Sequence, residues 1–329
     1  MGVCCQKLSE AEAMLAAGVK DVLISNEIVE KSKLERLVSL AAKYTNASIT
    51  LCVDSAAVIH ILDAECEACF DQTGKQVKIN LLVEVNVGQT RCGVEPGSAV
   101  VELAQEILNL KQQKKQKHKP ENEYLVFKGI QAYHGGLQHV RNYTDKKIAF
   151  WMVAQKVRYT LDLLKRHGIA CETVTGGGTG TFELEAGSNL YTEVQPGSYI
   201  FMDADYARNL NEKGEFVNTF KQALFVYTSV MSKSATAAVE SHRAVVDAGT
   251  KAVSLDSGVP LVNYGKQELI YKPGGDEHGI LIRKPEVTAK VAGVDNVADD
   301  DLESLSIAQK IMLIPGHCDP TVNMYNYIV

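Results

Sequence analysis

The sequence predicts an α/β protein: a TIM-like (β/α) barrel of the eight-stranded type that lacks one strand, followed by a C-terminal β domain. Up to about residue 220, short apolar runs alternate with amphipathic stretches, which is typical of parallel strands connected by helices. Seven strand-like runs are present there, one fewer than a closed barrel of this type uses. Beyond residue 220, strand-like runs follow one another across turns without long helices.

The expected strands are evenly spaced along the first part of the chain. They are "GVCC" (2–5), "DVLISN" (21–26), "SITLCVD" (48–54), "KINLLVEVNVG" (78–88), "FKGIQAYHG" (127–135), "CETVTGG" (171–177) and "TEVQPGSYIFMD" (192–203). Helices are expected between them, at 8–18, 31–45, 55–72, 98–113 and 147–168. We expect Ser9 and Glu12 to form a capping box at the first helix and Gly168 to end the last one.

The change of pattern predicts a division into two domains. Residues 1–220 are expected to form the barrel and residues 221–329 the β domain. At 329 residues and 46% hydrophobic composition, the chain can bury a sizeable core.

Composition and charge exclude several classes of protein. A net charge of −6 argues against a nucleic-acid partner. We interpret the basic run "KQQKKQKHK" (111–119) as part of a solvated loop insertion, 111–123. No apolar run approaches the roughly 18 residues needed to cross a bilayer, so no membrane partner is expected.

The cysteines and the N-terminal residues indicate a reducing compartment. The first residues lack the segment order of a signal peptide, and several of the eight cysteines lie in or beside strand-like runs, as reduced core thiols do. A cytoplasmic location follows from this interpretation. Cys66 and Cys69 have CxxC spacing but no second cysteine pair, which favours structural thiols over a zinc or redox site.

Three stretches after predicted strands carry candidate binding residues. "TGGGTGT" (175–181) could hold a phosphate on its backbone amides, or could be only a tight glycine turn. Arg91 lies just beyond a buried strand, where a guanidinium needs an anionic partner. Tyr133 and His134 come at the end of another strand, the active-site end in barrels, although a lone histidine is more often structural.

A candidate metal motif lies near the C-terminus of the sequence. In "PGHCDP", His317 and Asp319 have i, i+2 spacing and would point to the same side of an extended chain. An imidazole and a carboxylate suit Mn²⁺, Mg²⁺, Co²⁺ or Zn²⁺. Two ligands are few for a metal site, so spacing alone leaves this interpretation open.

Together these stretches resemble the metal-activated D-threonine aldolases and D-serine dehydratases, pyridoxal 5′-phosphate (PLP) enzymes with an alanine racemase-like barrel. The matching text includes "GVCCQKLSEAEAM", "EVNVGQTRCGV", "QAYHGGLQH", "TGGGTGTFELEA", "YTEVQPGSYIFMDADY", "DAGTKAVSLDSG" and "PGHCDPTVN". The resemblance runs nearly end to end, and its main departure is the 111–123 insertion. It implies a lyase of D-amino acid metabolism.

The resemblance also implies roles for individual residues. Arg91 would meet the PLP phenolate oxygen, and the catalytic His134 would lie against the PLP ring. The other implied PLP-binding residues are Tyr133, Tyr199 and the phosphate-binding Gly177, Gly178, Thr179 and Gly180. His317 and Asp319 would bind the metal, and their His-x-Asp form favours Mn, Mg or Co over Zn.

The lysine that forms the Schiff base with PLP is the missing part. In the relatives it follows the first barrel strand, one βα unit upstream of the text that matches the start of this chain. We therefore expect a chain truncated at both ends and inactive without that unit. Lys7 follows the first strand present. The relatives, however, carry a similar "QK" at this position in addition to their true lysine, which argues against Lys7 as a substitute.

The expected reaction is cleavage of a D-β-hydroxy amino acid to glycine and an aldehyde. Dehydration of D-serine or D-3-hydroxyaspartate is the alternative within the family, and a non-catalytic PLP-binding protein is the alternative from another class. A homodimer is expected from the resemblance alone. The expected binding partner is the substrate, a small-molecule D-β-hydroxy amino acid.

Overall fold

The computed structural model describes residues 2–116, 123–234, 242–264, 269–283 and 301–329. These residues form two compact units. Unit 1 contains residues 1–140 and 144–196, and unit 2 contains residues 141–143 and 197–329. The domain boundary at residue 220 stays a prediction.

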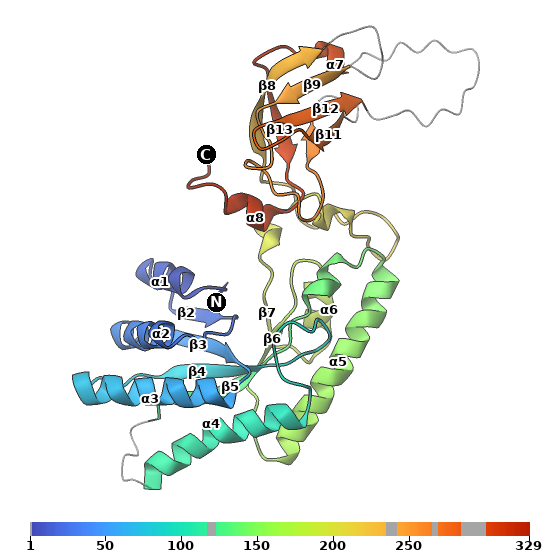
Figure 1. Ribbon diagram of the computed structural model, residues 1–329. Helices are drawn as coiled ribbons and strands as arrows, with labels where there is room; N and C mark the ends of the chain where they lie inside the picture. The colour runs from blue at the N-terminus through green and yellow to red at the C-terminus, as the bar shows by residue number, and fades with distance from the viewer. Residues whose placement is uncertain (1, 117–122, 235–241, 265–268, 284–300) are drawn as a thin grey trace. The chain divides into compact units, whose positions relative to one another are not determined.

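Unit 1 is built on an open parallel sheet of seven strands in the sequential order β1 to β7. Figure 1 shows neighbouring strands of this sheet, β2 to β5, side by side. The seven parallel strands agree with the expected barrel-type sheet. The strands are β1 (Val3–Cys5), β2 (Asp21–Ile24), β3 (Ser48–Val53), β4 (Ile79–Glu84), β5 (Leu125–Gln131), β6 (Thr173–Gly176) and β7 (Glu193–Val194).

Helices cover the outer face of this sheet. They are α1 (Leu8–Ala16), α2 (Lys31–Lys43), α3 (Ala56–Thr73), α4 (Ser98–Gln116), α5 (Tyr143–Arg166), α6 (Phe182–Gly187) and the 3₁₀ helix η1 (Gly135–His139). Strand residues alternate between two faces: Ile79, Leu81 and Val83 join the helix-covered core, whereas Leu82 packs in a separate inner cluster with Leu23 and Cys52. The sheet is therefore buried on both sides near its centre.

A bulge in the sheet explains one glycine. Between β4 and β5 the register shifts after Leu81, which pairs with Phe127, so that Leu82 pairs with Gly129. Gly129 has φ +153°, and a Cβ there would lie 1.8 Å from the carbonyl oxygen of Thr173 on β6. Only glycine permits this close approach.

Two local predictions, the capping box of α1 and the loop at the basic run, were wrong, and the helix end at Gly168 was confirmed. The cap of α1 is Lys7 instead of Ser9, and Glu10, not Glu12, accepts hydrogen bonds from the amides of Gln6 and Lys7. The basic run belongs to helix α4 as far as Gln116, because its Lys and Gln residues are good helix formers; 117–122 lie outside the described residues. Gly168 ends α5 with φ +69°.

The seventh predicted strand is also much shorter than expected. Only Glu193–Val194 pairs with β6, and the chain then enters η2 (Ser198–Ile200) in unit 2. Pro196 lacks the amide that would extend the ladder, and Gly197 follows it.

Unit 2 is centred on a closed antiparallel barrel, which confirms the expected β domain. Its strand order is β10-β11-β12-β9-β8-β13. The elements are η3 (Tyr206–Arg208), β8 (Val226–Ser234), β9 (Arg243–Val246), β10 (Leu261–Asn263), β11 (Leu269–Pro273), β12 (Gly279–Arg283), α7 (Asp301–Ser304), β13 (Lys310–Ile314) and α8 (Cys318–Val322). Inward apolar side chains such as Val230, Tyr271 and Leu281 form its core. No helix among the described residues is long and apolar enough to span a membrane.

Candidate functional site

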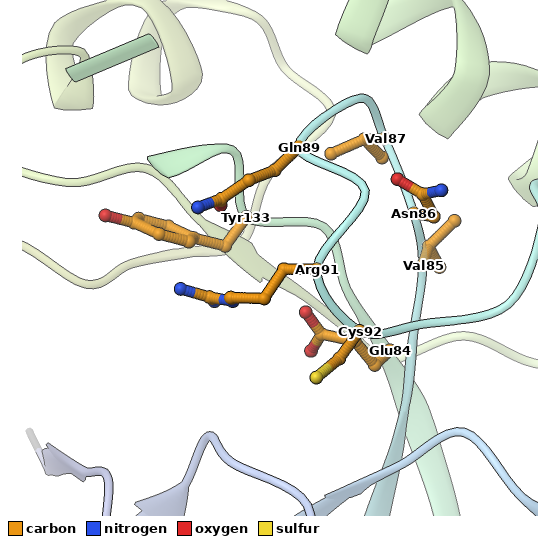
Figure 2. A pocket seen from close by; sticks show the side chains of 8 residues that line it. All are labelled: Glu84, Val85, Asn86, Val87, Gln89, Arg91, Cys92 and Tyr133. Carbon is orange, nitrogen blue, oxygen red and sulfur yellow. The ribbon is translucent and has the colours of Figure 1, made fainter. Parts of the chain in front are cut away.

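Candidate residues of unit 1 follow the carboxyl ends of neighbouring parallel strands. Arg91 comes after β4, and Tyr133 and His134 come after β5. The glycine loop, residues 175–181, contains the end of β6 and the turn that follows it. Because these strands are parallel and adjacent, the three loops meet at one edge of the sheet. Figure 2 shows the pocket that the β4 and β5 loops line, with Arg91 extended alongside Tyr133.

Arg91 and Tyr133 are in direct contact across this pocket. The guanidinium carbon lies 5.8 Å from the centre of the Tyr133 ring, within cation–π range. Arg91 is exposed, so the burial cost expected from its sequence position does not arise. A second contact joins the same two loops, because the amide of Gly135 donates to Gln89 Oε1 at 2.7 Å.

His134 is half-buried and neutral at pH 7. Burial, followed by the nearby Lys156 ammonium, lowers the pKa of its imidazole. Its Nδ1 atom is buried and has no hydrogen-bond partner among the described residues. A buried polar atom without a partner is uncommon in proteins, and it fits a ligand that reaches this loop.

The glycine loop likewise leaves polar groups unused. Gly177 and Gly178 are buried, and their backbone amides have no acceptor among the described residues. Gly177 has φ +74°, a left-handed conformation. The amide of Gly180, in contrast, donates to Gln138 Oε1 at 2.8 Å. Two unpaired amides on a glycine turn are suited to phosphate oxygens.

The inner face of the sheet contains a polar network that the sequence did not reveal. Glu84 is 4% exposed and accepts a hydrogen bond from Gln131, which also donates to the carbonyl of Ser25. Gln195 Nε2 donates in turn to Gln131 Oε1 at 2.9 Å. Burial, with the nearby Glu27 charge, raises the pKa of Glu84 to about 8. Glu84 also lines the pocket beside Arg91, so a neutral carboxyl lies there at pH 7.

The candidate metal residues of unit 2 do converge, although for a different reason from the one predicted. His317 is the N-cap of α8, and Asp319 lies in the first turn of that helix, so the triplet is not an extended strand. His317 Nε2 lies 3.2 Å from Asp319 Oδ2. Hydrogen bonding to Asp319 and then to Asp256 raises the pKa of His317 to about 9.

Asp256 is a functional candidate that sequence reasoning missed. Its Oδ2 lies 2.7 Å from Nδ1 of His317, while its Oδ1 accepts a hydrogen bond from Ser254 Oγ at 2.5 Å. A carboxylate on the far nitrogen fixes the orientation of an imidazole that binds a metal through its other nitrogen. The 61-residue separation of Asp256 from His317 hides this relation in the sequence.

Buried hydrogen bonds fix the loop that carries the triplet. The amide of Cys318 donates to Asp203 Oδ2 at 2.8 Å, and Asp203 is fully buried. Ser198 Oγ donates to Asp319 Oδ2 at 3.1 Å. In the described part of the chain no group of three or more His, Cys, Asp or Glu side chains has metal-site geometry. His317 and Asp319 are thus an imidazole and a carboxylate side by side, without a third such side chain in metal-site geometry among the described residues.

Three further sets of residues were considered from the sequence: Tyr199, Lys7 and the pair Cys66 and Cys69. Tyr199 belongs to unit 2, where its ring packs at 5.1 Å on that of Phe220. Lys7 is exposed after β1, at the same sheet edge as the unit 1 candidates. Cys66 and Cys69 both lie in α3, and all eight cysteines are thiols instead of disulfides.

The fold and these loops define an alanine racemase-like protein. Residues 1–205 match the family model for the alanine racemase N-terminal domain, and residues 223–329 match the model described as "Putative serine dehydratase domain". The chain belongs to the alanine racemase-like family that includes D-threonine aldolase and 3-hydroxy-D-aspartate aldolase.

Individual relatives support this membership. A 3-hydroxy-D-aspartate aldolase of Paracoccus denitrificans (strain Pd 1222) is 40% identical over all of this chain and 74% of its own length. A D-threonine aldolase of an Arthrobacter species is 38% identical over the whole chain and 75% of that relative. The crystal structure of D-threonine aldolase from Filomicrobium marinum superposes with a TM-score of 0.81 at 37% identity, covering 99% of this chain and 76% of the other.

Proposed function

We propose that this protein cleaves D-β-hydroxy amino acids to glycine and an aldehyde, with PLP and a divalent metal. The observation that carries the proposal is the combination of two unpaired amides in the glycine loop of unit 1 with the His317–Asp319 pair in unit 2. The aldolases among its relatives supply the reaction type. When bound, PLP withdraws electrons from the α-carbon of an amino acid, and a metal increases the acidity of a hydroxyl group.

In unit 1 the proposed roles rest on polar groups that can still form hydrogen bonds or ion pairs with a ligand. The Gly177–Gly180 segment, with Thr179, would hold the PLP phosphate, chiefly through the amides of Gly177 and Gly178. Arg91 would meet the phenolate oxygen, and Tyr133 supports that guanidinium. His134 would lie against the ring, and its uncharged, unpartnered Nδ1 can accept a proton.

In unit 2 His317 and Asp319 would bind the metal. An imidazole with a carboxylate suits Mn²⁺, Mg²⁺ or Co²⁺, and the absence of a thiolate donor makes Zn²⁺ less favoured. Cys318, between them, is buried, and burial raises the pKa of its thiol, so it is not offered as a thiolate. Tyr199 as a PLP contact, the homodimer and the cytoplasmic location stay predictions from the resemblance.

The test is product analysis with D-threonine and D-3-hydroxyaspartate as substrates. Aldolase chemistry yields glycine with acetaldehyde or glyoxylate, whereas dehydration yields ammonia with 2-oxobutanoate or oxaloacetate. The assay contains PLP and Mn²⁺, and L-threonine is the stereochemical control. Glycine formation that disappears with EDTA supports the proposal, and ammonia formation would favour the dehydratase alternative.

The lysine is tested separately by borohydride reduction of the PLP-treated chain and peptide mass mapping. Label on Lys7 would show a working substitute. If no lysine is labelled, the next experiment is a fusion of this chain to the N-terminal segment of the Paracoccus relative, on which the product assay is repeated. Specific PLP binding with no turnover in either form would favour the non-catalytic alternative.

A further inference from the structure

The underside of the glycine loop rests on buried ionisable side chains that the proposed function has not used. Lys146 of α5 is 4% exposed, and its ammonium donates to the carbonyl oxygen of Gly180 at 2.9 Å. Glu185 of α6 is also 4% exposed. A buried cation and a buried carboxyl thus lie directly under the loop that is proposed to hold a phosphate.

Glu185 is packed against the turn of the loop. A Cβ on Gly177 would lie 2.7 Å from Glu185 Cδ and 2.9 Å from its Oε2, so the carboxyl group occupies the space on that side of the Gly177 backbone. The side chain is held in this position because Thr181 Oγ1 donates to Glu185 Oε1 at 2.9 Å.

A chain of oriented hydrogen bonds links this carboxyl to the loop backbone. The amide of Gly180 donates to Gln138 Oε1, and Gln138 Nε2 donates to Thr181 Oγ1 at 2.9 Å. The Thr181 hydroxyl therefore has its proton directed at Glu185 Oε1. The other oxygen, Oε2, is buried and has no hydrogen-bond partner among the described residues, which makes it the place for a proton.

The charges under the loop decide how well it holds an anion. When Glu185 is ionised it opposes the Lys146 ammonium and repels a phosphate on the other side of the loop. When Glu185 is neutral this opposing and repelling negative charge is removed. Burial raises the pKa of Glu185 to about 7, with smaller opposing effects from Thr181 and Lys146, so both forms are present near neutral pH. Tyr191 is the other titratable group that senses this charge, and burial keeps it neutral.

We propose that Glu185 is a positioning residue of the phosphate loop and takes up a proton from solvent when an anionic phosphate ester binds. The proton goes to Oε2, while Oε1 keeps the hydrogen bond from Thr181. This inference rests on the proposed function, because it takes the loop to be the phosphate site, but it concerns a residue that does not touch the ligand.

The test is calorimetric titration of the full chain with pyridoxine 5′-phosphate between pH 7 and pH 9, without metal. This ligand has no aldehyde, so binding does not require a lysine. Pyridoxine has the same ring without the phosphate, and it corrects for the ring's own ionisations. Titrations at pH 8 in two buffers of different ionisation heat count the protons taken up.

For the wild type we expect close to one proton taken up per phosphate ester at pH 8. Its Kd should rise with pH by up to about tenfold per unit, the limit for one linked proton. Glu185→Gln keeps the acceptor for Thr181 and is neutral at every pH, so its Kd should be flat and its proton uptake absent. Glu183→Gln changes an exposed carboxylate of the same helix, α6, and should leave the uptake unchanged.

Two results would overturn the inference, and they differ in what they say about the proposed function. Binding of pyridoxine 5′-phosphate without proton uptake by the wild type, or with uptake retained in Glu185→Gln, removes the role of Glu185 and leaves the phosphate site intact. No binding by the folded wild type at any pH removes both. The wild-type measurement stands by itself if Glu185→Gln fails to fold.

Discussion

At the scale of single residues, the two nitrogens of the His317 ring have different partners. Asp256 can orient the imidazole without binding a metal itself. Asp256 holds Nδ1 of the imidazole and leaves Nε2 beside Asp319. Carboxylates in this position change metal affinity by about 10–100-fold when they are replaced. The role of Asp256 can therefore be tested by metal binding alone, without an activity assay.

We expect Asp256→Asn to weaken Mn²⁺ binding by about 10–100-fold, because the imidazole loses its charged hydrogen-bond acceptor. Isothermal titration with Mn²⁺ in the absence of PLP measures this affinity directly. Asp276→Asn, which removes an exposed carboxylate of unit 2 from a weak ion pair with Lys251, is the matched control and should bind as the wild type does. Equal affinities for the two variants would exclude an orienting role for Asp256.

At the scale of elements, the effect of backbone strain in the glycine loop can be distinguished from the effect of packing by comparing two glycines. Gly168 and Gly177 both have positive φ, +69° and +74°. A Cβ on Gly168 meets nothing within 4 Å, whereas a Cβ on Gly177 would collide with the buried Glu185. Gly168→Ala and Gly177→Ala should therefore both have a strained backbone, but only Gly177→Ala should also have a steric clash.

Gly168→Ala should lower the free energy of unfolding by about 1 kcal/mol, the usual cost of a left-handed alanine. Gly177→Ala should cost more than this and should also abolish binding of pyridoxine 5′-phosphate, because the loop must move away from Glu185. Urea unfolding followed by circular dichroism, together with calorimetry, compares the two variants. A Gly177→Ala protein that binds as tightly as Gly168→Ala would show that the loop conformation is not required.

The same elements show what could be predicted from the sequence and what could not. Apolar alternation, as in Ile79, Leu81 and Val83, identified the strands because burial on a sheet repeats every two residues. The short β7 and the true N-cap of α1 were missed because they depend on local hydrogen bonds. Glu10 accepts the hydrogen bond at the cap, Glu12 pairs with Arg36, and Pro196 has no amide to extend the ladder.

Candidate site residues show the same division between local and long-range information. Gly177 and His317 could be proposed as candidates because their motifs are contiguous in the sequence. Asp256 and Glu84 were missed because each meets its partner, His317 or Gln131, across a long stretch of chain. Such contacts exist only once the strands have been brought together.

At the scale of the whole molecule, the buried carboxyls of unit 1 set how stability depends on pH. Glu84 and Glu185 have pKa values raised by burial to about 8 and about 7, whereas in the unfolded chain they titrate near 4.5. Between these limits the folded protein binds more protons than the unfolded chain. Its free energy of unfolding therefore falls as pH rises from about 5 to about 8 and changes little beyond.

We predict that this decline is largely removed in a Glu84→Gln/Glu185→Gln double variant, which carries no acid to ionise at either position. Ellipticity at 222 nm follows unit 1, since its long helices α1–α5 dominate the signal, and urea unfolding at pH 5, 6.5 and 8 measures the dependence. The pKa of His134 is lowered, so this residue makes the stability of unit 1 rise with pH near pH 6.5, opposite to the two carboxyls. The pKa of His317 is raised to about 9, but this residue affects the stability of unit 2. A double variant that loses as much stability between pH 5 and 8 as the wild type would mean that both carboxyls ionise in the folded protein without cost, and the proton uptake inferred for Glu185 would then lose its physical basis.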